Sequence, residues 1–346
     1  MPVDIKAWDF KHGTEEEVAA FNRCSNQMRA ERWPDDPPIP VEQTAQGLKH
    51  FPDHLEMTLW TGWVEGASRI GAYGLIQYSL QDNLHMAQFG INVLPEFRRQ
   101  SLGSELLSRI VQVAREQNRR LLITDTMDRI PAGEAFMLRI GAEKGLETHT
   151  NQLVVAALDP DLLREWQERA EERGAGFEVG QWEGRYPEED IDAIVDLHTL
   201  LNQQPFGDLD VEDFTHSAEN IRQSEESLFA RGYERWTLYA REVDTGRFAG
   251  YTEVFWNPNL PEIITQGMTG VFPEFRNRGL GRWLKAAMLD RILAERPQAR
   301  FVRTGNADMN APMLKINNEL GFKPYAAEAV WQVETEKAAE YLSRYE

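Results

Sequence analysis

The chain has 346 residues, enough for two domains of ordinary size, and 42% of them are hydrophobic, so it can bury real cores. A net charge of −19 argues against a nucleic-acid or anionic-membrane partner, because both need a basic surface. Cys24 is the only cysteine, which excludes an internal disulfide. The histidines show no metal-ligand spacing, so we expect no metal.

The sequence carries no evident targeting or membrane signal. Its opening residues, Met1 to Lys6, lack the apolar core of a signal peptide. No apolar run is long enough to cross a bilayer. We therefore expect a cytoplasmic enzyme, present as a monomer or a homodimer.

Local patterns predict strands and helices throughout the first half. Residues 3–8 alternate in polarity, as a half-buried strand does. Thr14 followed by three glutamates is a capping box, which predicts a helix that fades before Trp33. Further strands are expected at 54–64, 69–80, 84–94, 120–125 and 152–158, and further helices at 41–49, through 106–114 and at 134–140.

A charged segment with helical propensity, residues 159–173, separates two similar halves. Gly174-Ala175-Gly176 ends it, and we place a linker between domains at 159–174. Beyond the linker the order of elements restarts. Strands are expected at 177–182, 236–241, 247–255, 263–271, 300–304 and 328–333, and helices from 187, from 280 and at 310–320.

The two halves are tandem repeats. Landmarks recur at a nearly constant separation, which is strong evidence of duplication. We expect domains at 1–158 and 175–346, each with a strand, two helices, three antiparallel strands, a helix, a strand, a helix and a strand. The matched pairs are Pro95/Pro273, Arg98/Arg276 and Gly103/Gly281 at a separation of 178, and Gly141/Gly321 at 180.

The most informative stretch links the strand at 263–271 to the helix that begins at Leu280. Gly279 and Gly281 lie in this turn, where glycine permits positive φ and close approach of a ligand. The unpaired N–H groups of the first helical turn, together with the helix dipole, favour phosphate. Three arginines, at 276, 278 and 282, surround the turn. This combination predicts a diphosphate site.

The turn Arg276-Asn277-Arg278-Gly279-Leu280-Gly281 resembles motif A of the GCN5-related N-acetyltransferases (the GNAT family), Arg/Gln-x-x-Gly-x-Gly/Ala. The segment from Asn310 to Phe322 resembles motif B of the same family. The resemblance covers essentially the whole chain as a tandem pair. It implies an α+β fold with two mostly antiparallel sheets flanked by helices, and acetyl-CoA as co-substrate. The residues it implies for acetyl-CoA binding are Val271, Arg276, Asn277, Arg278, Gly279, Leu280, Gly281, Arg282, Asn306 and Asn310.

The same resemblance implies direct attack of an amine, from a small molecule or a peptide, on the thioester. The N–H of Val271 is the expected donor to the developing oxyanion. Glu253 and Glu262 are candidates for the base that deprotonates the amine, although a solvated surface glutamate is the simpler interpretation of either. Where similar enzymes often have a tyrosine that protonates the thiolate, this chain has Asn317, which cannot act as an acid. It is expected to assist by hydrogen bonding, and a polar residue on a helix surface is an equal alternative.

The first half departs from these motifs. Ser101 stands where the second half has Gly279, and Met137 stands where it has Asn317. A serine is strained if that position needs positive φ. We therefore expect catalysis in the second domain and a weakened or lost cofactor site in the first. The rival hypothesis is a non-catalytic acyl-CoA-binding or regulatory module.

Overall fold

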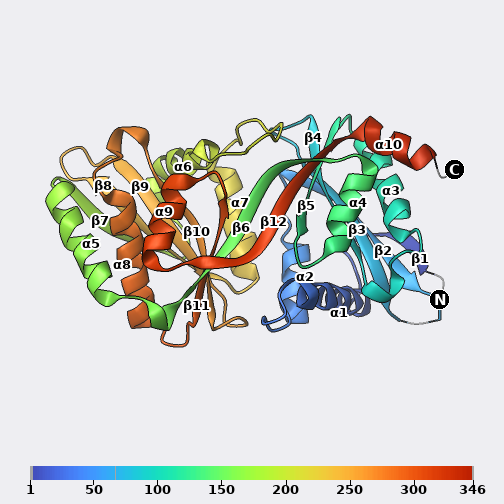
Figure 1. The fold of residues 1–346 in the computed structure, drawn as a ribbon, viewed down its shortest axis with the longest axis horizontal. Helices are drawn as coiled ribbons and strands as arrows, with labels where there is room; N and C mark the ends of the chain where they lie inside the picture. Colours follow the sequence, from blue (N-terminus) through green and yellow to red (C-terminus); the bar gives the residue numbers. More distant parts are fainter. Residues whose placement is uncertain (1–2, 67, 345–346) are drawn as a thin grey trace. The chain divides into compact units, whose positions relative to one another are not determined.

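The computed structural model describes residues 3–66 and 68–344 (Figure 1). The chain forms two compact units. The first unit contains Met1–Glu147, Phe206–Thr215 and Ala326–Glu346, and the second contains Thr148–Pro205 and His216–Tyr325. No helix within the described residues is long and apolar enough to span a membrane.

The first unit is built on strands in the order β1-β2-β3-β4-β5-β12. All neighbours are antiparallel except β4 and β5. Its strands are β1 (Val3–Trp8), β2 (Leu55–Val64), β3 (Ile70–Ser79), β4 (Met86–Val93), β5 (Leu121–Met127) and β12 (Lys323–Glu334). Its helices are α1 (Glu15–Arg32), α2 (Val41–Lys49), α3 (Leu102–Glu116), α4 (Pro131–Ile140) and α10 (Thr335–Ser343).

Helices cover both faces of this sheet. The ring of Tyr73 on β3 lies 5.0 Å from that of Phe21 on α1. A Cβ on the next residue, Gly74, would contact Leu106 on α3. Since successive strand residues point to opposite faces, α1 and α3 lie on opposite faces. Helices α3, α4 and α10 share one face, where Phe136 packs near both Gly103 and Tyr341.

The second unit repeats this plan with the strand order β6-β11-β10-β9-β8-β7. Only β10 and β11 are parallel. Its strands are β6 (Glu143–Val154), β7 (Phe177–Glu183), β8 (Glu234–Glu242), β9 (Phe248–Trp256), β10 (Ile263–Val271) and β11 (Phe301–Ala307). Its helices are α5 (Pro160–Arg173), α6 (Ile191–His198), α7 (Ala218–Ala230), α8 (Leu280–Glu295) and α9 (Ala311–Leu320). Strand β6 begins within the first unit and pairs with β11 through residues 148–154.

The two repeats exchange their closing strands. We expected each half to close with its own last strand. Instead, β12 from the end of the chain pairs with β5, and β6 from the first repeat pairs with β11. The helix that follows each strand goes with it, so α10 packs on α3 and α5 packs on α8. The boundaries at 158 and 175 thus remain predictions about the sequence repeat, whereas the compact units divide the chain differently.

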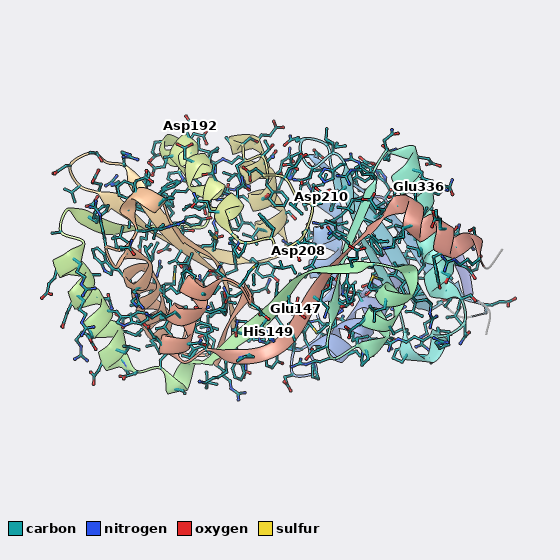
Figure 2. All side chains as sticks on the ribbon, turned by 45° about the horizontal axis from the view of Figure 1, so that its top comes forward. Glu147, His149, Asp192, Asp208, Asp210 and Glu336 are labelled. Atoms are coloured by element: carbon teal, nitrogen blue, oxygen red, sulfur yellow. The ribbon has the colours of Figure 1, made fainter. Side chains whose placement is uncertain are left out.

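Most predicted elements are present, with shifted ends. Thr14 forms the predicted capping box, with its hydroxyl and the Glu17 carboxylate each accepting a backbone N–H. Strand β6 begins at Glu143, whereas the prediction placed its start at 152. The prediction missed the start because the first residues of the strand are polar and lack an apolar alternation. Helix α7 takes the place of the second helix expected in the second half, for which no bounds were predicted, and α10 was not predicted. Acidic side chains such as Asp192 and Glu336 project from the surface, so their charge is solvated (Figure 2).

Candidate active site

In the second unit the predicted phosphate turn has the expected backbone. Asn277 and Gly279 take positive φ, at 64° and 84°, and α8 begins at Leu280. Leu280 is buried in the core, so it anchors the turn. A Cβ on Gly281 would meet Ile316 of α9 and Val271 of β10 only at 3.9 and 4.0 Å. A side chain at position 281 would therefore make only ordinary contacts with these two elements.

The three arginines around the turn each contact the protein. Arg276 donates from Nε to the Val271 carbonyl at 3.0 Å and from Nη2 to Gln203 at 2.6 Å. Arg282 is paired with Glu319 of α9 at 2.9 Å. Arg278 lies over the ring of Phe177, 5.4 Å from its centroid. These contacts orient the turn.

Strands β10 and β11 diverge beside this turn. Their parallel ladder covers Ile263–Thr265 and Phe301–Arg303. Beyond it β10 stays paired with β9 as far as Val271, while β11 stays paired with β6 as far as Ala307. Because the next N–H, that of Phe272, donates to Ala249 of β9, the N–H of Val271 points the other way, toward the gap. This is the orientation that an oxyanion donor at Val271 needs.

Glu253 lies on β9, which pairs with the edge of β10 that faces away from β11. It lies beside an irregularity in this pairing. The register of β9 and β10 shifts between Gln266 and Thr269. There the N–H of Met268 donates to the Glu253 carboxylate, and the Tyr186 hydroxyl lies 3.4 Å from it. Burial raises the pKa of Glu253. The other candidate base, Glu262, pairs with Arg300 at 3.2 Å, with both side chains more than half exposed. A half-buried carboxylate with a raised pKa fits a general base better than a solvated one.

Asn317 is a buried residue rather than a polar residue on the helix surface. It is 1% exposed, its Oδ1 accepts a hydrogen bond from Lys285 Nζ at 2.7 Å, and its Nδ2 donates to Asn306 Oδ1 at 2.7 Å. Asn310 caps α9 through the N–H of Met313, at 3.4 Å. Asn306, Asn310 and Asn317 thus all shape the α9 side of the site. Sequence reasoning missed Lys285, although its place one helical turn after Gly281 was a usable signal.

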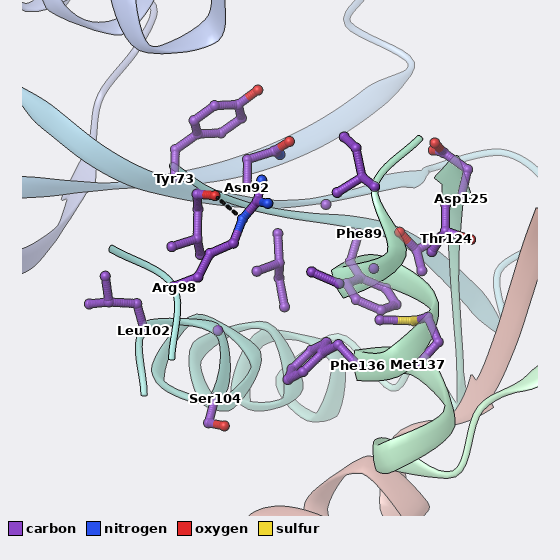
Figure 3. A pocket seen from close by; sticks show the side chains of 18 of the residues that line it. Tyr73, Phe89, Asn92, Arg98, Leu102, Ser104, Thr124, Asp125, Phe136 and Met137 are labelled. Atoms are coloured by element: carbon purple, nitrogen blue, oxygen red, sulfur yellow. Dashed lines mark hydrogen bonds between the residues drawn. The ribbon is translucent and has the colours of Figure 1, made fainter. Parts of the chain in front are cut away.

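The first unit holds an open cavity of about 1050 Å³ at the corresponding place. It is lined by the turn at 98–104, by diverging β4 and β5, and by α4. Figure 3 shows Phe89, Thr124, Phe136 and Met137 around it, with Arg98 at its edge. The turn keeps the backbone of its counterpart, since Arg99 and Ser101 both have φ of 63°. The cavity is of the size that holds a cofactor-sized ligand.

The chemistry of the two sites differs at equivalent positions. In the repeat, Leu75 corresponds to Glu253, Leu107 to Lys285 and Met137 to Asn317. The pairing of β3 with β4 runs without a shift from Ala72 to Gln77, so it lacks the irregularity found between β9 and β10. The first unit therefore combines a cavity with apolar residues where the second has titratable or amide groups.

Ser101 allows a direct test of the turn. We expect Ser101→Gly to raise the free energy of unfolding by about 1 kcal/mol, because a non-glycine residue pays roughly that cost in the left-handed region. The matched Gly279→Ser variant should lose a similar amount of stability because Gly279 also has positive φ. No clash should add to this loss, since its Cβ would have only ordinary contacts with Ala170 at 3.8–3.9 Å. Denaturant unfolding of both variants measures this, and equal stability of Ser101→Gly and wild type would contradict it.

The chain thus forms two repeats of an α+β fold, each with a left-handed turn at a helix start beside two diverging strands. The model of the acetyltransferase (GNAT) family matches residues 21–141, which include the first of these turns. Comparison with curated proteins finds no match. Residues 21–141 thus match the GNAT family model, and the chain has the fold of a tandem GNAT protein over 96% of its length.

Solved structures share this fold. A tandem GNAT protein from the clavulanic acid biosynthesis pathway matches with a TM-score of 0.78 at 24% identity, over 96% of this chain and 98% of that one. A GCN5-related N-acetyltransferase from Sphaerobacter thermophilus matches with a TM-score of 0.64 at 15% identity, over 96% of each chain. A glucosamine N-acetyltransferase region of a fungal multi-domain β-N-acetylglucosaminidase matches with a TM-score of 0.65 at 13% identity, over 96% of this chain and 38% of that one.

Proposed function

We propose that the protein is an acetyl-CoA-dependent N-acetyltransferase that acetylates a primary amine in its second unit. The observation that carries the proposal is Glu253, a half-buried carboxylate with a raised pKa beside the strand that presents the Val271 N–H. Direct aminolysis of a thioester requires a base and an oxyanion donor. Here the two groups lie on the two sides of β10.

In this mechanism the first turn of α8 holds the diphosphate of acetyl-CoA through its backbone amides. Glu253 takes a proton from the bound ammonium group, directly or through water. The amine then attacks the thioester carbonyl, and the Val271 N–H stabilises the negative charge that develops on the carbonyl oxygen. The acceptor is a small-molecule or peptide amine.

The first unit supports a second candidate function. Its cavity and its phosphate turn suit an acyl-CoA, but Leu75 and Met137 provide neither base nor hydrogen-bonding amide. We propose that this unit binds an acyl-CoA without turning it over. If neither unit catalyses transfer, the protein is a binding or regulatory module.

Release of free thiol from acetyl-CoA by the full chain separates these functions. The amine panel should include polyamines, peptides with free N-termini and, prompted by the fungal structural neighbour, amino sugars. We expect amine-dependent thiol release with at least one class. Stoichiometric binding of acetyl-CoA without release by any amine would instead favour the binding module.

A further inference from the structure

Among the residues that the structure describes, the second unit contains a buried lysine with no acidic partner. Lys285 of α8 is 2% exposed. Its Nζ donates to the amide oxygen of Asn317 at 2.7 Å and lies 5.4 Å from the centroid of the Phe322 ring, and no described carboxylate pairs with it. A buried ammonium group without a counter-ion is unfavourable. Its counterpart Leu107 is fully buried, so the fold itself needs only an apolar residue at this position.

The location of Lys285 relates it to the reaction. Glu253 and Tyr251 are two residues apart on β9 and thus share a face of the sheet, and Tyr251 stacks on His198 of α6. Lys285 lies instead on α8, which packs with α9 on the opposite face. The Val271 N–H lies between the two, at the gap in the sheet. An amine that approaches the carbonyl from the Glu253 side leaves the sulfur on the Lys285 side.

We propose that Lys285 is the general acid that protonates the departing CoA thiolate, an inference that rests on the proposed function. Glu253 first takes the ammonium proton and releases it to water. The amine nitrogen then forms a bond to the carbonyl carbon, and the second proton, which the nitrogen loses as the amide forms, passes to Glu253. The carbon–sulfur bond then breaks, the sulfur leaves with the electron pair, and Lys285 transfers a proton from Nζ to it. The products are the amide and the free thiol, and the neutral lysine regains a proton from solvent. Asn317 is a positioning residue that holds the lysine side chain.

The electrostatics of the site support this role. Burial lowers the pKa of Lys285 to about 7. Since an unperturbed thiol has a pKa of about 8.5, transfer of the proton from Lys285 to the thiolate is favourable. The charged groups of the neighbouring elements do not cause this shift, which arises from burial alone. These charged groups are Arg282 of α8, Lys315 and Glu319 of α9, and Arg303 of β11. Arg303 donates to Gln152 of β6.

The test is Lys285→Met, with Leu107→Met in the first unit as the matched control. We expect the lysine variant to lower kcat by about 10²-fold or more. It should also leave KM for acetyl-CoA near its wild-type value and remove the limb of the kcat–pH profile that falls as pH rises through about 7. The control variant should keep the wild-type rate and profile.

Unfolding provides a readout independent of activity. The folded-state pKa of Lys285 is depressed, so the unfolded chain binds more protons between about pH 7 and the ordinary lysine value of 10.5. Wild-type stability should therefore rise with pH across that window. Lys285→Met should gain most in stability below pH 7, with a gain that shrinks as pH rises.

The outcomes separate the two proposals. If wild type turns over an amine and Lys285→Met keeps both its rate and its pH profile, the role of Lys285 is wrong and the proposed function stands. If wild type releases no thiol with any amine, the proposed function fails and the role of Lys285 fails with it. A folded Asn317→Ala variant with an intermediate loss of kcat would support the positioning role of Asn317.

Discussion

We expect Glu253→Gln to lower amine-dependent turnover about 10²- to 10⁴-fold while acetyl-CoA affinity stays unchanged. The amide keeps the size of the side chain but cannot take a proton. Burial raises the pKa of Glu253, so wild-type activity should fall as pH falls through that raised value, because the carboxylate then becomes protonated. This acidic limb should be absent from the residual activity of the variant. Steady-state kinetics across pH, with calorimetry for acetyl-CoA, measure both effects.

Glu262→Gln is the matched control. Glu262 is exposed, forms an ion pair with Arg300 at 3.2 Å and lies at the far end of β10 from the gap. An exposed pair contributes little to stability, so this variant should fold and react as wild type does. If Glu262→Gln lost activity and Glu253→Gln kept it, the base would be assigned to the wrong residue.

Local features of the fold could be predicted because their causes lie within a few residues. The capping box at Thr14 and the helix cap at Asn310 depend on side chains that reach their own helix. Gly279 was expected at positive φ, and the serine at its counterpart, position 101, adopts the same conformation. Strand β10 has the predicted bounds because Pro273 follows it and its β-branched residues mark its length.

The exchange of closing strands could not be predicted in this way. Strands β6 and β12 have the same length and equivalent positions in the two repeats, so neither sequence specifies which of two similar strands, β5 or β11, it pairs with. That choice depends on contacts between residues far apart in the chain. Strand register is set by the partner as well as by the pattern.

The inward orientation of Asn317 is also a tertiary property. On α9 alone, Asn317 lies between Ile316 and Asn318, so its polar side chain suits an exposed face as well as a buried one. Its burial follows from Lys285 and Asn306, which come from two other elements and provide partners for both ends of its amide. Buried polar groups are tolerated where such partners exist, and sequence periodicity does not reveal them.

The paired variants Gly281→Val and Gly103→Val test which unit is active. At both positions a Cβ would meet only ordinary contacts, 3.9 Å or more at Gly281 and 3.6–3.7 Å from Phe136 at Gly103. Neither glycine has positive φ, so both variants should fold. The added methyl groups would fill the space at the first helical turn where the diphosphate is expected to approach the backbone.

We expect Gly281→Val to weaken acetyl-CoA binding at the second unit by at least about 100-fold, which is roughly 2.7 kcal/mol, and to abolish turnover at ordinary substrate concentrations. Gly103→Val should keep the wild-type turnover, because Leu75 and Met137 give the first unit no catalytic groups. If the cavity of the first unit binds an acyl-CoA, calorimetry of wild type should show two sites and each variant should lose one. Loss of turnover in Gly103→Val with wild-type turnover in Gly281→Val would place the active site in the first unit and make the cavity there catalytic.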